Sequence, residues 1–584
     1  MHWKIRGLIA ILLIGSAAAL TSCGEESAPL TTPQTSMPVG HQVTPTPTRT
    51  PIPLDRIALT PTPMPVAQSA LADIRQRGEV RVGVLYNYPP LGYMADNGQL
   101  HGYEVELMRR IAERWEVDVT FVQVTRQSRL PMLLDGKVDI LAAAMPHRRE
   151  LEQFVEFTDT VFQGGFVMLV RADSGLDITA ALAGGTIAVL GDEAQQAALQ
   201  RAHQAGVEPR IQLYDTPDQA VEALRAGAVS AIVDRRERLM LVAQSDNEVV
   251  MLDEYVLAEP YAFAVRRGDI PLRDLLNLTL YDIIRAGEIG EIFSANFYGL
   301  PADLFSTPTG ETVYNFATLP ADIPAYTSVI DRLRSGSPLR VAGLDLSEQP
   351  MLYDSQPILD GFNRAVINEM ARRWNVSVVE IPASTGQAGL DLVAQGQADL
   401  MVGVRPDLGY IGKFAFSQPY YDRALRLIHL QDVAVANVLD LEFKPTAVVN
   451  PVDLSQQIVE DNNDFPRVRV AASYEEAFEA LTTRAVYAVV GDEYALTLMA
   501  RADPRIVVDE RRYRPREMVM VLPRFDADFQ ALVNFTLQDM QQDGTLDALR
   551  QQYFAPYLPD GQTLEPFRIE IWPGDGSFLS LGGR

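Results

Sequence analysis

The chain contains two copies of one ordered pattern, and this duplication limits its possible folds more than any other feature. Trp374 lies 259 residues after Trp115, and Phe416 follows Phe157 at the same spacing. The repeat units of solenoid proteins are only about 20–50 residues long. A period this long therefore indicates a whole duplicated domain.

Each copy alternates short apolar strands with amphipathic helices. In the first copy, "EVRVGVLYNYPP" predicts a strand that enters a proline turn, and "YEVELMRRIAERW" predicts a helix with Val105, Met108, Ile111 and Trp115 on one side. "VDVTFVQV" and "VDILAAAM" predict further strands. The second copy has "PLRVAGLDL", "GFNRAVINEMARRW", "VSVVEIP" and "DLVAQGQADLMVGV" in the same order. This alternation predicts α/β domains.

These segments resemble the bacterial extracellular solute-binding proteins of the polar amino acid type, family 3. That family has the type II periplasmic binding fold, which it shares with the ligand domains of ionotropic glutamate receptors. The resemblance covers residues 71–299 and 328–557. It rests on ordered sets in both copies, among them "RVGVLYNYPPLGY", "LPMLLDGKVDILAAAM", "VEFTDTVF", "GQADLMVGV" and "FAFSQPYY".

The resemblance implies two tandem type II periplasmic-binding-protein domains, each of two α/β lobes joined by two crossover strands. For the first copy it implies a first lobe at 71–172 plus 259–299 and a second lobe at 173–258. The crossovers would follow "FVMLVRADSG" and precede "EPYAFAVRRGD". Ligand bound to one lobe would recruit the other, and closure about the hinge would report occupancy.

The N-terminal residues predict export and lipid attachment. Lys4 and Arg6 precede an apolar run from Leu8 to Leu20, which is too short to span a bilayer and is typical of a signal peptide. The run ends in "LTSC", which resembles the lipobox of bacterial lipoproteins and implies that Cys23 is lipidated. Cys23 is the only cysteine, so a disulfide is not its purpose. An ordinary signal peptide followed by a chance cysteine is the alternative.

These features divide the chain into six expected segments. A lipoprotein signal peptide is expected at 1–22, a tether rich in proline and threonine at 23–68, and a first solute-binding domain at 69–299. They are followed by a linker at 300–327, a second and diverged domain at 328–558, and a C-terminal tail at 559–584. The tether should be extended because proline fixes its own backbone angle and lacks a donor.

Composition and motifs exclude several functions. A formal charge of −26 argues against nucleic acid as a partner, because binding polyphosphate needs a basic face. The six histidines are too scattered for zinc pairs. The sequence contains no nucleophile elbow, no phosphate loop and no cysteine–histidine pair. We therefore expect no metal, no cofactor and no enzymatic activity.

The loop after "VDILAAAM" corresponds to the place where the family grips its ligand's carboxylate. A family arginine does so with a bidentate pair, but a match without gaps places Leu151 at that position. Arg148 is the candidate replacement from a shifted register. The alternative is that Arg148 and its neighbour are solvated or pair with adjacent glutamates. The candidates around this loop are Ala144, Met145 and Arg148.

Other candidates in the first copy are less specific. Arg126 stands where the family often has an aromatic lid, and is either a second anion anchor or a solvent-facing arginine. The turn after the first strand normally contributes a pocket wall. Its Tyr86 either stacks on the ligand or is simply packed. The candidates in that turn are Tyr86, Asn87 and Leu91.

The second lobe of the first copy offers carboxylates. Asp192 and Glu193 stand where the family has a glycine-serine-threonine turn whose donors help to bind the ligand's carboxylate. They either cap a helix with a favourable dipole interaction or form a pocket for an amine-bearing ligand. Asp234 lies one residue before the family's usual ammonium-binding aspartate.

The second copy departs further from the family pattern. Its first-strand turn lacks the aromatic residue, and Tyr410 falls near the expected arginine. Arg405, which corresponds to Met145, is the remaining anion candidate, and Asp492 sits at the ammonium position. This copy binds a different ligand or serves as a pseudo-domain for structure or partner contact.

The resemblance thus implies a lipid-anchored, extracytoplasmic protein that captures a small polar solute, with an amino acid as the first expectation, for an ABC permease. The anchor would be held at the periplasmic side or the cell surface. A lipoprotein that senses ligand or acts as a scaffold for a separate receptor is the alternative. A third, less favoured possibility is a small-molecule dehydratase, since a few relatives with this fold have that activity.

Overall fold

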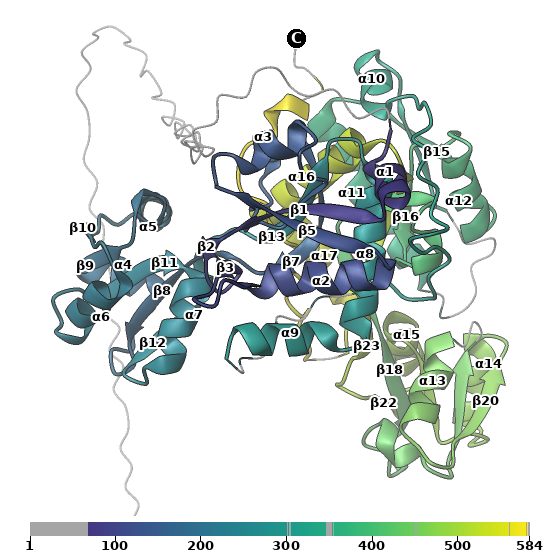
Figure 1. The fold of residues 1–584 in the computed structure, drawn as a ribbon. Coiled ribbons are helices and arrows are strands. Elements are labelled where there is room, and N and C mark those ends of the chain that lie inside the picture. Colours follow the sequence, from purple (N-terminus) through teal and green to yellow (C-terminus); the bar gives the residue numbers. More distant parts are fainter. Residues whose placement is uncertain are drawn as a thin grey trace, which may run out of the picture. The chain divides into compact units, whose positions relative to one another are not determined.

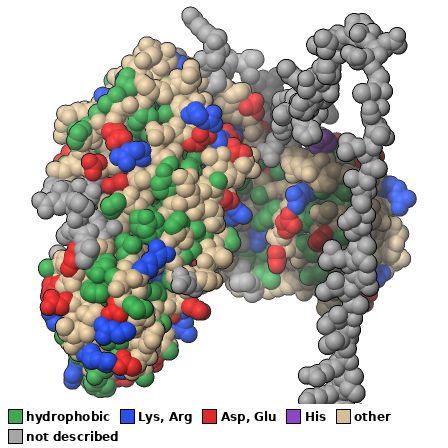
Figure 2. All heavy atoms as spheres, turned by 180° about the vertical axis from the view of Figure 1, so that it is seen from behind, with side chains coloured by type: hydrophobic (Ala, Val, Ile, Leu, Met, Phe, Trp, Pro, Cys, Tyr) green, Lys and Arg blue, Asp and Glu red, His purple; other side chains and the backbone are tan. Residues whose placement is uncertain are grey.

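The computed structural model describes residues 68–581 apart from 299, 301, 303–304, 306, 346–352, 354, 450–452, 560 and 580. The expected signal peptide, Cys23 and the tether up to residue 67 lie outside the described residues. No helix in the described part of the chain is long and apolar enough to cross a membrane. On the face shown in Figure 2, acidic and basic side chains are interspersed, not gathered by sign.

The first lobe of domain 1 is built on one mixed sheet in the order β5-β1-β6-β13-β7. β1 runs parallel to both of its neighbours, and β13 runs antiparallel to β6 and β7. The strands are β1 (Glu79–Leu85), β5 (Asp118–Val124), β6 (Ile140–Leu141), β7 (Val155–Phe162) and β13 (Tyr261–Arg266). A small sheet, β2 (Asn87–Tyr88), β3 (Gly92–Met94) and β4 (Leu100–His101), follows β1.

Helices cover this sheet as the apolar periodicity predicts. The expected helix is α2, Tyr103–Trp115, and its predicted stripe of Val105, Met108, Ile111 and Trp115 is buried. The same core holds side chains of α8 and α9, whereas α3 contributes to a separate core that includes Met145. The helices of this lobe are α1 (Ala70–Arg77), α2, α3 (Arg129–Leu134), α8 (Ile270–Arg285) and α9 (Glu288–Asn296).

The second lobe of domain 1 has a five-stranded sheet in the order β10-β9-β11-β8-β12 with helices on both faces, at the left of Figure 1. Its strands are β8 (Gly165–Arg171), β9 (Thr186–Val189), β10 (Arg210–Leu213), β11 (Ala231–Arg235) and β12 (Val249–Ala258). Its helices are α4 (Ile178–Gly184), α5 (Asp192–Ala205), α6 (Pro217–Arg225) and α7 (Arg236–Ser245).

The chain crosses between the lobes twice, and the first crossing lies earlier than expected. We expected the crossover to follow residues 166–175, but β8 already belongs to the second lobe, so the crossing is at Gln163–Gly164. The second crossing, at Glu259–Pro260, lies where expected. The two crossings touch: a Cβ on Gly164 would lie 2.7 Å from the Glu259 carbonyl oxygen. Because β8 is apolar throughout, its sequence did not reveal to which lobe it belongs.

Domain 2 repeats this architecture with the two sheets joined into one. β23 (Tyr513–Pro523) pairs with strands of the first lobe through its second half and with β18 through its first half. The first lobe has β14 (Leu339–Ala342), β15 (Val378–Ile381), β16 (Leu400–Val404) and β17 (Phe414–Phe416). The second lobe has β18 (Tyr421–Leu430), β19 (Pro445–Val449), β20 (Arg467–Ala471), β21 (Ala488–Asp492) and β22 (Ile506–Val508).

Helices cover domain 2 in the corresponding places. In the first lobe they are α10 (Val329–Arg334), α11 (Gln356–Trp374), α12 (Gly386–Ala394), α16 (Ala527–Gln542) and α17 (Thr545–Tyr553). In the second lobe they are α13 (Asp453–Asp461), α14 (Tyr474–Thr482) and α15 (Glu493–Ala502). The tandem type II fold expected from the sequence is thus confirmed.

Equivalent helices α8 and α16 contribute to the contact between the domains. Arg524, just before α16, donates from Nε to Asp274 of α8 at 2.8 Å, and Arg273 of α8 reaches Gln530 of α16 at 3.0 Å. The C-terminal tail packs on both domains. Trp572 stacks on His147 of domain 1 at 3.7 Å between ring centroids and also packs in the core of domain 2.

Candidate functional site

The cleft of domain 1 holds a cluster of charged and aromatic side chains where both crossings meet the sheets. Tyr88 comes from β2, Arg126 comes from the loop after β5, and Arg148 comes from the loop after β6. The second lobe supplies Glu193 from the first turn of α5, Arg235 from the end of β11 and Glu237 from α7. The second crossing and β13 add Glu259 and Tyr261.

The deepest part of the cluster is a carboxylate held between two guanidinium groups. Glu259 has a fully buried side chain, and its two oxygens accept from Arg148 and Arg235. Arg235 also donates to the Tyr261 hydroxyl at 3.1 Å, and its ring contact with Phe166 places the guanidinium carbon 4.1 Å from the centroid. Burial alone would raise the pKa of Glu259, but the two arginines outweigh it and lower that pKa.

Glu193 joins the lobes at the outer end of the cluster. One of its oxygens, Oε2, accepts from Arg126 of the first lobe at 2.9 Å and from Arg235 of the second lobe at 2.7 Å. Burial alone would raise the pKa of Glu193, but Arg235 and Arg126 outweigh it and hold that pKa at about 2. Glu193 is therefore ionised at neutral pH and acts as a bridge between two cations.

Two tyrosines complete the wall of the cleft. Tyr88 and Tyr261 both donate their hydroxyl groups to Oε1 of Glu237, at 2.6 Å and 2.9 Å. The Arg126 guanidinium lies 4.9 Å from the centroid of the Tyr88 ring, a cation–π contact. Because Tyr88 belongs to the first lobe and Glu237 to the second, this contact also links the lobes.

The structure thus brings together three of the predicted residues, Arg126, Arg148 and Glu193. Arg148 is buried against the hinge carboxylate, so it is neither solvated nor paired with its neighbouring glutamates through a described hydrogen bond. Its neighbour Arg149 points elsewhere and binds domain 2, with Nη1 2.7 Å from Asp539. Sequence reasoning missed five members of the cluster: Tyr88, Arg235, Glu237, Glu259 and Tyr261.

Other predicted residues of domain 1 lie outside this cluster. Leu91 and Met145 are core residues, at most 1% exposed. Tyr86 packs against the core and donates its hydroxyl to the Phe121 carbonyl at 3.2 Å. Asn87 and Asp192 are exposed at the surface. Leu91 and Met145 thus pack in cores of the first lobe in this structure, and their assignment as ligand contacts stays a prediction.

Asp234 and Ala144 are held by contacts of their own. Asp234 is buried and pairs with Arg238 one helical turn later, and burial raises the pKa of Asp234 to about 6. Ala144 has a left-handed backbone with φ of +47°, and its N–H donates to the carboxylate of Glu104 at 2.9 Å. Burial raises the pKa of Glu104 to about 7 despite that donor.

In domain 2, the predicted ammonium position is already occupied by a side chain of the chain itself. Asp492 accepts from Arg423 Nη2 at 2.7 Å and also caps α15 through the N–H groups of Tyr494 and Ala495. Burial would raise the pKa of Asp492, but Arg423 outweighs it and lowers that pKa. Arg423 lies 3.4 Å from the Ser355 hydroxyl of the first lobe, so it spans this cleft.

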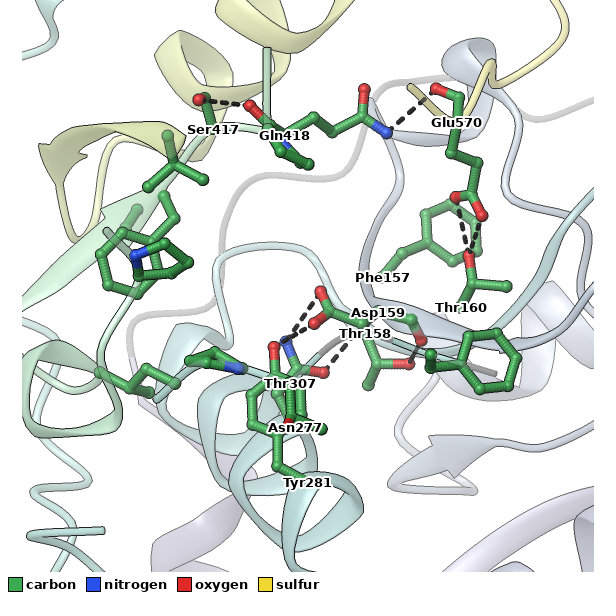
Figure 3. A pocket seen from close by; sticks show the side chains of 18 of the residues that line it. Phe157, Thr158, Asp159, Thr160, Asn277, Tyr281, Thr307, Ser417, Gln418 and Glu570 are labelled. Atoms are coloured by element: carbon green, nitrogen blue, oxygen red, sulfur yellow. Dashed lines mark hydrogen bonds between the residues drawn. The ribbon is translucent and has the colours of Figure 1, made fainter. Parts of the chain in front are cut away.

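Arg405 does not lie in the cleft of domain 2. It lines a cavity of about 440 Å³ between the first lobes of the two domains. Figure 3 shows Asn277 and Tyr281 of domain 1 on one side, with Ser417 and Gln418 of domain 2 across the cavity. Glu570 of the tail accepts from Thr160 at 2.7 Å at its edge. Arg405 directly follows the end of β16 at Val404.

The part of the chain that the structure describes contains no group of three or more His, Cys, Asp or Glu side chains arranged to hold a metal ion. The ion pairs described for the two clefts each join a carboxylate to a guanidinium group. Such a site can recognise a charged solute by hydrogen bonds and can link its binding to lobe closure.

Comparison with known proteins gives one consistent result. The model of the family "Bacterial extracellular solute-binding proteins, family 3" matches residues 80–298 and 340–556. The glutamine-binding protein of Geobacillus stearothermophilus is 26% identical over 263 residues, which cover 44% of this chain and 91% of that protein. The ABC transporter glutamine-binding protein GlnH of Bacillus subtilis is 25% identical over 232 residues, which cover 39% of this chain and 84% of that protein.

A similar protein of known structure is also found. An ancestral cationic amino acid solute-binding protein is 28% identical with a TM-score of 0.35, and the match covers 39% of this chain and all of that chain. The relatives are binding proteins of transport systems, as the sequence led us to expect. Because the two family segments span more than half of the sequence, this chain belongs to the bacterial extracellular solute-binding proteins, family 3, and carries two tandem copies of that domain.

Proposed function

We propose that this chain captures a small polar solute, an amino acid or a related compound, in the cleft of domain 1 and presents it to an ABC importer. The observation that carries the proposal is the charged cluster that joins the two lobes at the hinge. The relatives support it, because they are named for glutamine binding and one is named for an ABC transporter.

Lobe closure follows from where the cluster residues originate. Arg126 and Tyr88 belong to the first lobe, and their partners Glu193 and Glu237 belong to the second. A solute that replaces one of these contacts would be held from both sides only when the lobes meet. Binding energy would therefore favour the closed form, which the permease recognises.

The cleft of domain 2 supports a different role for that domain. Arg423 neutralises Asp492 from within the chain, so a ligand's ammonium group would have to displace a guanidinium group that is already paired and only partly exposed. We infer that domain 1 carries solute binding and that domain 2 supports contact with the permease or a receptor.

We also propose that Cys23 carries a lipid that anchors the chain outside the cytoplasmic membrane. The sequence "LTSC" and the proline-rich segment after it support this proposal. Mass spectrometry of the N-terminal peptide from cell membranes tests it. A peptide that begins at Cys23 with a diacylglyceryl mass supports the anchor, and an unmodified or uncleaved peptide rejects it.

A thermal-shift screen of the full chain against amino acids, polyamines, small organic acids and sugars tests the main proposal. A ligand at a hundredfold excess over its Kd stabilises the folded state by about 2.7 kcal/mol. We expect the stabilising ligand to lose its effect in Arg126→Ala and to keep it in Arg201→Ala, which breaks the Arg201–Glu254 pair of the second lobe away from the cluster. No shift with any compound would reject solute binding, and conversion of the ligand would instead indicate an enzyme.

A further inference from the structure

The two domains place opposite charges at one equivalent position. In domain 1, Arg235 ends β11 and pairs with Phe166 of β8. In domain 2, Asp492 ends β21 and pairs with Leu425 of β18. Each residue is thus the last of the strand that lies between the two equivalent neighbours. At the position where domain 2 has a carboxylate, domain 1 has a guanidinium that is 97% buried.

Of the three cleft carboxylates in domain 1, Glu193 is held least firmly. The side chains of Glu259 and Glu237 are fully buried, and each has two partners: two arginines for Glu259 and two tyrosines for Glu237. Glu193 also has two partners, and like Glu237 it engages only one of its oxygens in described hydrogen bonds, but its side chain is 36% exposed. It can therefore leave towards solvent by rotation of its own side chain.

The charges of the cluster balance only while Glu193 is present. Three arginines (Arg126, Arg148 and Arg235) face three glutamates (Glu193, Glu237 and Glu259). When Glu193 swings out, one positive charge is left unmatched between Arg126 and Arg235. In addition, three buried atoms of the cluster have no hydrogen-bond partner in the described part of the chain, and two of them, Nε of Arg148 and of Arg235, are donors, whereas Oε2 of Glu237 is an acceptor. Unmet buried donors favour a ligand that brings acceptors.

We propose that the Glu193 carboxylate stands in for the carboxylate of the ligand, and that domain 1 takes a small carboxylic acid without an α-ammonium group. The acid replaces Glu193 between Arg126 of the first lobe and Arg235 of the second. This inference rests on the proposed function and narrows its solute class. An α-ammonium group next to the bound carboxylate would face Arg235, and two cations at that separation repel each other.

Isothermal titration of the full chain with matched pairs of solutes tests this inference. Glutarate and glutamate differ by the α-ammonium group, and lactate and alanine differ by a hydroxyl in its place. We expect an acid to bind and its amino acid partner to bind at least tenfold more weakly. Glu193→Ala removes the internal competitor and should strengthen acid binding about tenfold.

Two further variants keep the test decisive. Glu193→Gln keeps the size of the side chain but removes its charge, and it should also strengthen acid binding, which covers the case that Glu193→Ala folds poorly. Glu254→Ala breaks an exposed arginine pair elsewhere in the second lobe and should leave affinity unchanged. Weaker acid binding in both Glu193 variants would overturn the inference.

The failures of the two proposals can be told apart. If amino acids bind and the matched acids do not, solute capture stands and the acid inference is overturned. If neither class binds the parent chain or either Glu193 variant, in titration and in the thermal-shift screen, solute capture itself is rejected and the inference falls with it.

Discussion

At one equivalent position, the clefts of the two domains hold charges of opposite sign, and each charge is paired with side chains of the same chain. In domain 1, Arg235 is neutralised by Glu193 and Glu259, and in domain 2 Asp492 is neutralised by Arg423. In both clefts, the charge at this position is thus neutralised by side chains of the same chain. They differ in depth, because the side chain of Arg235 is 4% exposed and that of Arg423 is 27% exposed. Duplication preserved the fold, whereas the charge at the binding position was free to change.

This difference indicates which residue of such a fold sets the charge of its cleft. The strands before the position are alike, with buried Ala231–Val233 in domain 1 and Ala488–Val490 in domain 2. The last residue of the strand carries opposite charges in the two domains, while the residues before it remain apolar and buried. A tandem protein can therefore present two recognition surfaces on one scaffold.

The largest expected effect comes from removing the buried cation of domain 1. Arg235→Ala leaves Glu259 with Arg148 alone and Glu193 with Arg126 alone. Removing one partner of a buried ion pair costs about 3–5 kcal/mol, and here the cluster would keep three glutamates with only two arginines. We expect the free energy of unfolding of domain 1 to fall by that amount in urea denaturation.

The domain 2 counterpart sharpens the comparison. Asp492→Ala should cost less than Arg235→Ala, because Arg423 retains more contact with water. Arg225→Ala, which breaks an exposed pair with Asp246, serves as the control and should cost at most about 1 kcal/mol. Equal losses in the two cleft variants would show that burial does not distinguish the domains.

The sequence predicted the fold well and the site only in part. The long-period duplication and the alternating strands and helices were enough for two type II domains, and the stripe of α2 is buried as predicted. Arg126, Arg148 and Glu193 were found because each stands in a loop that the family uses.

The missed residues share one physical cause. Arg235 and Glu259 are far from each other and from Glu193 along the chain, and only the two crossings bring them together. Their charges read as ordinary surface charges in the sequence. The prediction for Arg405 failed for a different reason. Arg405 aligns with Met145 and follows β16 directly, but it lines the cavity between the two first lobes. One signal was available: the aligned ends "VDR" and "VGD" differ in charge.

The next largest expected effect is a pH dependence of the stability of domain 1 that domain 2 does not share. Glu104 at the start of α2 aligns with Asn363 within α11 and is buried, with a pKa raised from 4.5 to about 7. Because the folded state holds this proton more tightly than the unfolded state, stability falls as pH rises from about 4.5 to about 7. The loss from this one group is about 3 kcal/mol.

Urea denaturation of Glu104→Gln at pH 4.5 and pH 8 checks this prediction. The difference in free energy of unfolding between variant and parent should shift by about 3 kcal/mol in favour of the variant when the pH is raised from 4.5 to 8. The reciprocal change Asn363→Asp should give domain 2 a similar sensitivity. A difference between variant and parent that does not change with pH would contradict the raised pKa of Glu104.

The smallest expected effect concerns the backbone after the central strand of each first lobe. Ala144, which follows β6 in domain 1, has φ of +47°, and Gly403, near the end of the equivalent strand β16 in domain 2, has φ of +67°. The left-handed conformation costs a residue with a Cβ about 1–2 kcal/mol, which the greater freedom of glycine in the unfolded chain partly offsets. Ala144→Gly should therefore stabilise domain 1 by about 0.5–1 kcal/mol in urea denaturation.

Gly403→Ala should destabilise domain 2, since its Cβ would lie 2.9 Å from the side-chain amide nitrogen of Asn363. That amide has little room to move, because Tyr420 donates its hydroxyl to Asn363 Oδ1 at 2.6 Å. If Ala144→Gly also destabilised its domain, the cost of the left-handed alanine would already be offset by contacts of its methyl group, and the two domains would have solved the same turn in different ways.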